Sequence, residues 1–128
     1  KGYLEKMDIR VETVEDAIKI IKILSNMAHG TLLESDIVGT LAAVHRIIWE
    51  KPAAQSKMGA EGSCEALIKL FDMYKTSSSL VSDGCMQIMS ALCRCHDDKQ
   101  YSNDDNISRF GTDSCVEGAL FIIYASNN

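Results

Sequence analysis

The sequence has little proline, few aromatic side chains and no long apolar segment. Pro52 is the one proline among 128 residues, and Phe, Trp and Tyr together make up 6% of the chain. Proline-punctuated β structure is therefore not expected. The longest apolar run, from Ala119 to Ala125, is far shorter than the roughly 18 residues that a membrane-spanning helix needs. We expect a protein that does not insert directly into a membrane.

The chain also lacks an excess of positive charge and an N-terminal secretion signal. Thirteen Lys and Arg stand against 18 Asp and Glu, which gives a formal net charge of −5. This balance argues against a strongly basic nucleic-acid-binding module. Lys1 and Gly2 are not followed by an apolar stretch. We therefore expect a cytoplasmic protein without a nucleic-acid partner, with the nucleus as the alternative compartment. Because no initiating Met is present, we also expect a processed protein or a fragment.

The cysteines do not have the spacing of a common metal site. Five are present: Cys64, Cys85, Cys93, Cys95 and Cys115. An odd number without a signal peptide indicates reduced thiols. Alternate residues of a helix, such as Cys93 and Cys95, point about 200° apart, and no second pair completes a zinc site. We predict no metal, no cofactor and no catalytic residue. Mild reactivity of Cys64 and Cys115 is an alternative, since a helix N-terminus lowers a thiol pKa.

Two polar motifs near the C-terminus have simple interpretations. The segment from His96 to Asp105 carries four Asp but lacks the alternating ligands and central Gly of a calcium loop. We expect a solvated loop there. The triplet Asn106-Ile107-Ser108 matches the N-glycosylation pattern, and without a secretion signal we expect it to be silent.

What the sequence does contain is apolar residues at every third or fourth position, which is typical of amphipathic helices. The expected helices span residues 13–28, 33–50, 53–58, 63–75, 79–95, 106–110 and 114–125, with a further short helix within 1–12. Thr13 with Asp16, Ser63, Ser79 and Ser114 are the expected N-terminal caps. Gly30 and Gly59 are expected to end helices. Pro52 should end the helix before it.

Similar segments recur along the chain. The segment 58–67 resembles 110–120, and 39–48 can be superposed on 84–93 at an offset of 45 residues. A period in the forties, built from one short and two longer helices, indicates an α-solenoid.

These segments resemble armadillo repeats, in which a short first helix ends in a glycine and the second helix opens near small residues. The resemblance is carried by 56–67, by 106–111 followed by 114–117, and by 81–86, which is similar to the start of a third helix. It implies an all-α, right-handed α-solenoid of about two and a half repeats. Residues 1–128 would form a single domain and a fragment of a longer array. Further repeats, a partner or a second copy would cover the last helix.

The resemblance also implies a binding groove lined by the third helices. Its ladder positions fall on His45 and Trp49 in the first repeat and on Ser90 and Arg94 in the next, with Ala42 and Gln87 one turn earlier. The ladder asparagine is absent at both positions, which argues against an importin-type groove. Packing of Trp49 in the core or against Pro52 is the competing interpretation.

The function that follows is a non-catalytic scaffold or adaptor, which binds a partner protein or an extended peptide in this groove. A regulator of a small GTPase, or a trafficking or motility adaptor of armadillo type, is one alternative. Another is a compact helical-bundle interaction domain of a nuclear or transcription factor, which residues 17–74 resemble in part. An enzyme is not expected.

Overall fold

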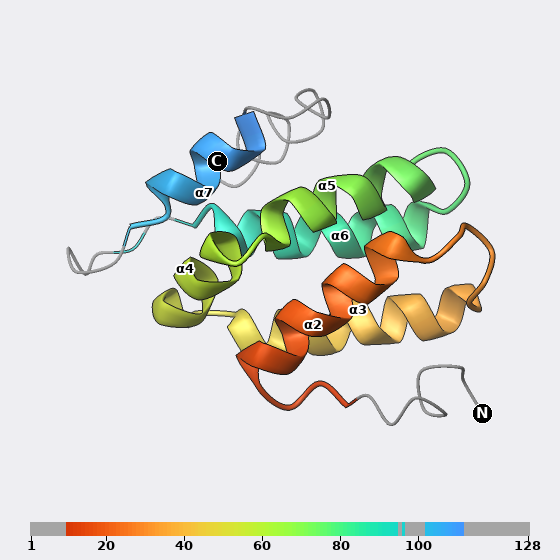
Figure 1. The fold of residues 1–128 in the computed structure, drawn as a ribbon, viewed down its shortest axis with the longest axis horizontal. Coiled ribbons are helices and arrows are strands. Elements are labelled where there is room, and N and C mark those ends of the chain that lie inside the picture. The colour runs from red at the N-terminus through yellow and green to blue at the C-terminus, as the bar shows by residue number, and fades with distance from the viewer. Residues whose placement is uncertain (1–9, 95, 97–101, 112–128) are drawn as a thin grey trace.

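The computed structural model describes residues 10–94, 96 and 102–111, and over these residues the protein is all-helical with no strand. The described residues form six helices (Figure 1): α2 (Val14–Asn26), α3 (Glu34–Ile48), α4 (Pro52–Ala60), α5 (Ser63–Tyr74), α6 (Ser79–Leu92) and α7 (Asp104–Gly111). The predicted all-α class is confirmed. No helix in this part of the chain is long and apolar enough to span a membrane.

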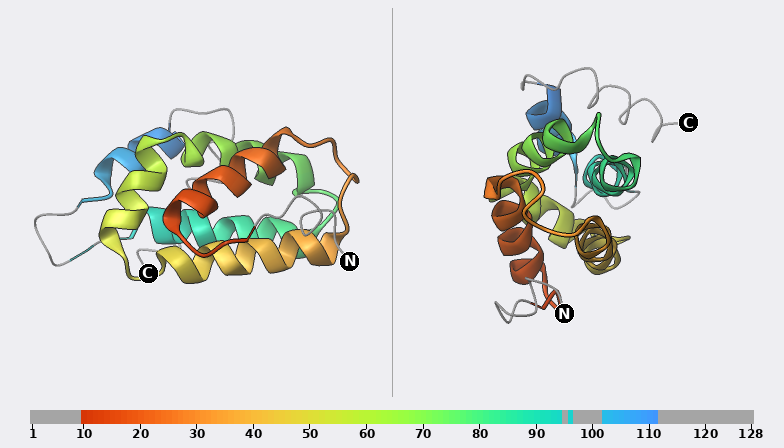
Figure 2. Two further views of the ribbon diagram at one scale, coloured as in Figure 1. Left: turned by 60° about the horizontal axis from the view of Figure 1, so that its bottom comes forward. Right: turned by 90° about the vertical axis from the view of Figure 1, so that its right-hand side faces the viewer.

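The helices are arranged in a repeat-like order. Helices α2 and α3 are followed by α4, α5 and α6, and then by α7. Helix α2 packs against α5, α3 against α6, and α4 against α7. Each helix therefore lies beside the helix three places further along the chain. Helices α2 and α5 form one layer and α3 and α6 the other (Figure 2). Helices α3 and α6 run in the same direction, so their C-terminal ends lie at the same end of the layer (Figure 1).

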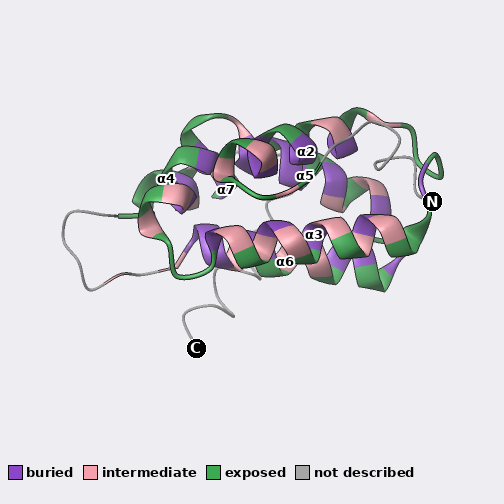
Figure 3. Cartoon of the chain, turned by 90° about the horizontal axis from the view of Figure 1, so that it is seen from below, coloured by how far each residue is buried: buried purple, intermediate pink, exposed green. Residues whose placement is uncertain are grey.

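The core fills the space between the two layers, and the faces that α3 and α6 turn to solvent carry exposed and half-buried residues (Figure 3). Its largest fully buried side chains come from every helix: Ile20, Ile21, Ile37, Leu41, Ile48, Met58, Leu67, Leu70, Ile88, Met89, Leu92 and Phe110. The periodicity predicted most of these positions. Ala28 is an exception, because α2 ends at Asn26 and Ala28 is exposed in the following turn.

The start of α2 follows the sequence prediction. The Thr13 hydroxyl accepts a hydrogen bond from the Asp16 N–H at 3.2 Å, and Asp16 Oδ2 accepts from the Thr13 N–H at 3.1 Å. This reciprocal capping box satisfies backbone donors that a helix leaves unpaired at its first turn. The Gly30 prediction was wrong. Helix α2 stops before it, and Gly30 lies in the turn with φ 84°.

Two other predicted caps are displaced by one residue. Helix α5 is preceded by Gly62, whose φ of 95° favours glycine, and Ser63 is the first helical residue. The Ser63 hydroxyl is buried and has no hydrogen-bond partner in the structure. Helix α6 is capped by Ser78 rather than Ser79. The Ser78 hydroxyl accepts from the Val81 N–H at 3.2 Å and donates to Glu34 Oε2 at 2.6 Å, which joins the beginnings of α6 and α3.

The sequence predicted that Gly59 ends a helix, and this was wrong. Gly59 lies inside α4, which begins at Pro52 and extends to Ala60. A Cβ atom at Gly59 would overlap the side-chain amide of Asn106 in α7. Gly84 has a similar role between α6 and α3, since a Cβ atom there would lie 2.9 Å from Leu41 Cδ1. The missing side chains at these two glycines therefore allow α4 to approach α7 and α6 to approach α3 closely.

The C-terminal part differs from the predicted solvated loop. Helix α6 ends at Leu92 rather than at Cys95, α7 begins at Asp104, and Asn103 before it is buried. The expected helix at 114–125 lies outside the described residues, as do 97–101 and residues 1–9 of the expected N-terminal helix. Residues 10–12 precede α2 without helical structure.

Two glycine substitutions should have opposite effects on stability. Gly39→Ala places a methyl group in open space on α3 and improves helix propensity, so we expect stabilisation by up to about 1 kcal/mol. Gly59→Ala must displace the Asn106 amide, so we expect a loss of about 1–3 kcal/mol. Denaturant unfolding followed by circular dichroism measures both. A Gly59→Ala protein as stable as the original would contradict the packing of α7 on α4.

Candidate functional site

The adjacent C-terminal ends of α3 and α6 carry the side chains with the strongest binding potential. Pro52 requires an extended residue before it, so α3 cannot continue and ends at Ile48. The chain turns through Glu50, which adopts a φ of 57°, and the Lys51 N–H donates to the Ile48 carbonyl at 3.1 Å. This turn is tight and keeps Trp49 at the tip of α3, where its N–H donates to the His45 carbonyl at 2.9 Å.

The Trp49 ring contacts two other side chains, and the residue remains 40% exposed. The His45 imidazole stacks on it at 5.1 Å between ring centroids, with 27° between the ring planes. The guanidinium carbon of Arg94 lies 4.3 Å from the centre of the indole ring, a cation–π contact. Glu50 Oε1 lies 4.0 Å from Arg94 Nη2. We call these four residues, His45, Trp49, Glu50 and Arg94, the tryptophan surface.

The sequence offset of 45 residues pairs Trp49 with Arg94, and the structure brings the two side chains into contact. The other predicted groove residues lie on the same two helices. Ala42 and Gln87 are exposed, and Ser90 is half-buried. Trp49 is not in the core, and its described ring contacts are with His45 and Arg94. Whether the six residues form a ligand groove stays a prediction.

Burial lowers the pKa of His45 below its ordinary value of 6.5. The imidazole is therefore neutral at neutral pH and can stack on Trp49 without adding a second positive charge beside Arg94. Protonation is disfavoured in the folded chain relative to the unfolded one. The stability that the neutral His45 contributes to the folded chain is therefore fully present above pH 6.5. The free energy of unfolding falls as the pH drops from 6.5 towards the lowered pKa of His45.

A cluster of buried amides fixes the backbone at Arg94. The Asn103 side chain donates 2.8 Å to the Arg94 carbonyl and 2.9 Å to Gln55 Oε1, and the Gln55 amide donates 3.0 Å to the Ile48 carbonyl. Gln55 thus contacts the last residue of α3 while its partner Asn103 holds the chain just beyond α6. We call Gln55, Asn103 and Asn106 the amide cluster.

Asn106 is the member of the amide cluster that joins α7 to α4 and α6. Its side-chain N–H groups donate to the Gln55 carbonyl at 3.1 Å and the Leu92 carbonyl at 3.0 Å, and its Oδ1 accepts from Arg109 at 2.8 Å. The amide is 1% exposed, so the glycosylation triplet that begins here is inaccessible in the folded chain. The structural role of this cluster was not predicted from the sequence. The helical Gly59 opposite Asn106 was the available signal.

The histidines and cysteines make structural contacts. His29 stacks on Tyr74 at 4.6 Å, and His96 Nε2–H donates to Gln55 Oε1 at 2.7 Å. Cys64 and Cys85 are buried free thiols, Cys93 is buried, and Cys95 and Cys115 lie outside the described residues. Burial raises the pKa of Cys64 and brings that of Cys85 to about 12. The suggested reactivity of Cys64 was therefore wrong, since its thiolate is suppressed.

Within the described ranges, no group of three or more His, Cys, Asp or Glu side chains is placed to hold a metal ion. Asp104 and Asp105 of the acidic run are exposed in the first turn of α7, where negative charges favour the helix N-terminus. Asp97 and Asp98 lie outside the described residues.

No family model matches the chain, and no curated protein or solved structure shows a significant similarity to it. Membership of the armadillo family therefore stays a proposal that rests on the sequence motifs and on the stacking of equivalent helices.

The fluorescence of Trp49, the one tryptophan of the chain, should report the protonation of His45. Because a protonated imidazole quenches an indole that it contacts, we expect emission to fall between about pH 8 and about pH 5. The midpoint should lie below 6.5, since burial lowers the pKa of His45.

His45→Gln should remove this pH dependence. His29→Gln is the matched control, because His29 stacks on Tyr74 instead, and it should leave the titration unchanged. An emission that does not change with pH, or a titration that survives in His45→Gln, would show that the stacked pair is wrong.

Proposed function

We propose that the chain is a non-catalytic protein–protein interaction module that uses the tryptophan surface to bind a partner protein or an extended peptide. The observation that carries the proposal is the contact, at 4.3 Å, of Arg94 just beyond α6 with the ring of the exposed Trp49 just beyond α3. Trp and Arg are among the residue types most enriched at binding hot spots.

The geometry favours binding because both anchors are already ordered. Trp49 is fixed by the end of α3 and by the stacked His45, and the Arg94 backbone is held by Asn103. A side chain that is held in place before binding loses less conformational entropy when the partner arrives. The same contacts leave 40% of Trp49 accessible for a partner to cover.

We further propose a right-handed α-solenoid of armadillo type with about two and a half repeats. Support comes from the packing of α2 on α5, α3 on α6 and α4 on α7, since stacked repeats place equivalent helices side by side. A compact helical bundle does not require this correspondence. Helices α3 and α6 would be third helices, and Ala42, His45, Trp49, Gln87, Ser90 and Arg94 would face the groove. A cytoplasmic location is part of this proposal.

A random-peptide display library selected on the intact chain tests the proposed function. We expect peptides that bind the original protein and lose at least about 2 kcal/mol of binding free energy in Trp49→Ala, because truncation removes a central anchor. Leu80→Ala is the control. Leu80 is 55% exposed but lies in the first turn of α6, about 20 Å of helix away from Arg94.

Helix content and thermal unfolding of each variant are measured in parallel, so that a loss of fold is separated from a loss of binding. Recovery of no peptides, or of peptides that bind the Trp49→Ala protein equally well, would contradict the use of this surface.

A further inference from the structure

Positive charge gathers around Trp49 although the chain as a whole is acidic. Arg46 and Lys51 flank Trp49 in the sequence, Arg94 lies on its ring, and Glu50 is the one acidic residue between them. Arg46 and Lys51 are exposed, and neither forms an ion pair within the described ranges. Among the described residues, three cations and one carboxylate thus flank or contact Trp49, on a chain whose formal net charge is −5.

The Arg94 guanidinium has unused hydrogen-bonding capacity. A guanidinium carries five N–H donors arranged to match a carboxylate. The approach of Glu50 to Arg94 is 4.0 Å, longer than a hydrogen bond, and both side chains are exposed, at 41% for Arg94 and 66% for Glu50. Such a pair contributes little in water. A better placed carboxylate could therefore replace Glu50 at small cost.

We propose that the tryptophan surface binds an acidic segment of a partner protein. A carboxylate of that segment pairs with Arg94, and a neighbouring apolar or aromatic side chain covers the exposed face of Trp49. Arg46 and Lys51 add longer-range attraction for further acidic residues of the segment. Glu50 is an intramolecular competitor for the same guanidinium. This inference rests on the proposed function and specifies the chemistry of its partner.

The same charges disfavour other partners. A basic segment would be repelled by Arg46, Lys51 and Arg94 together. A nucleic acid offers phosphates, but its affinity depends on neutralising many of them, and three cations on a chain of net charge −5 are few for that purpose. A short acidic protein segment needs only one good carboxylate contact and one apolar side chain.

The peptides recovered from the display library on the intact chain decide between these partners. We expect those that require Trp49 to be enriched in Asp and Glu next to a large apolar residue, and to bind more weakly as salt rises. Neutral or basic peptides that still require Trp49 would overturn this inference and leave the proposed function intact. A library without binders that require Trp49 would overturn the proposed function itself.

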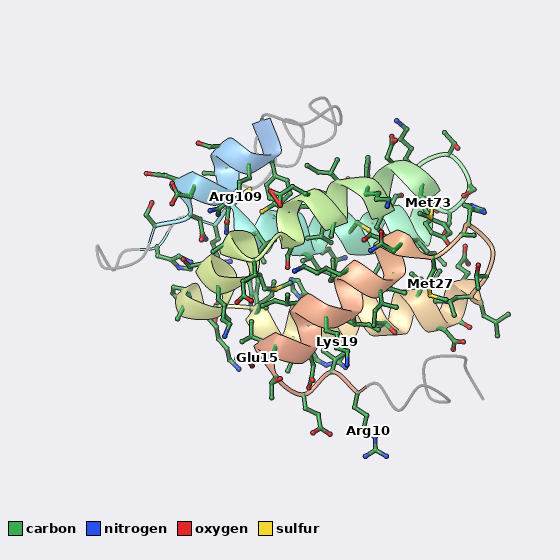
Figure 4. The ribbon with its side chains drawn as sticks, in the orientation of Figure 1. Arg10, Glu15, Lys19, Met27, Met73 and Arg109 are labelled. Carbon is green, nitrogen blue, oxygen red and sulfur yellow. The ribbon has the colours of Figure 1, made fainter. Side chains whose placement is uncertain are left out.

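Substitutions then test the assigned contacts with one recovered acidic peptide, whose binding is followed by fluorescence anisotropy. Arg94→Gln should weaken binding about tenfold or more, because a charged hydrogen bond is lost. Glu50→Gln should strengthen it about two- to fivefold, since the competitor loses its charge. Lys19→Gln removes one positive charge from α2 in the other layer and should change little (Figure 4). Equal effects of Arg94→Gln and Lys19→Gln would indicate general charge attraction and overturn the assignment.

A reversal of charge gives an independent check. Selection of the library on an Arg94→Glu chain with unchanged helix content should recover peptides with Lys or Arg in place of the acidic residues. Two results would instead overturn the proposal in favour of another occupant. One is a dimer of the chain that dissociates on Arg94→Gln while no peptide binds. The other is a single-stranded RNA oligonucleotide that binds more tightly than the acidic peptides.

Discussion

Two buried amides, those of Gln55 and Asn106, bring together α4, the end of α6 and α7. Each would be costly to bury without partners, and each has them: Gln55 bonds to Ile48 and Asn103, and Asn106 bonds to the carbonyls of Gln55 and Leu92. The carbonyl of Leu92, the last residue of α6, which the helix leaves unpaired, is thereby satisfied by the Asn106 side chain. Because the same amides reach the ends of α3 and α6, they set the positions from which Trp49 and Arg94 project.

Much of the fold could be predicted from the sequence because apolar spacing and the polar caps act locally. The capping box of Thr13 and Asp16 is complete within four residues, and the structure has it as predicted. Errors arose where a local signal competed with a distant contact. Gly59 looked like a helix end, but its missing side chain makes room for Asn106, 47 positions further along the chain. Ser63 looked like a cap, but the left-handed Gly62 precedes the helix instead.

The candidate site could likewise be predicted from the sequence only in part. The repeat offset paired Trp49 with Arg94 because equivalent positions of stacked helices face the same side, and this relation needs no knowledge of side-chain detail. The sequence did not reveal the stacking of His45 on Trp49, the left-handed turn at Glu50 or the support from Asn103. Asn103 lies in a polar segment that looked solvated, and only the folded chain places it against Arg94. Composition alone rarely identifies a buried polar residue of this kind.

The burial of Asn106 makes the order of folding and modification decisive for this chain. Its triplet is a substrate for glycosylation only while the chain is still unfolded, since the amide nitrogen that would carry the sugar donates hydrogen bonds in the core. A sugar attached to the nascent chain would occupy the space next to Gly59 and keep α7 from docking. In a secretory compartment, folding would thus compete in time with the glycosylating enzyme. In a compartment without that enzyme, the triplet is not modified, and Asn106 can form its buried hydrogen bonds whatever the rate of folding.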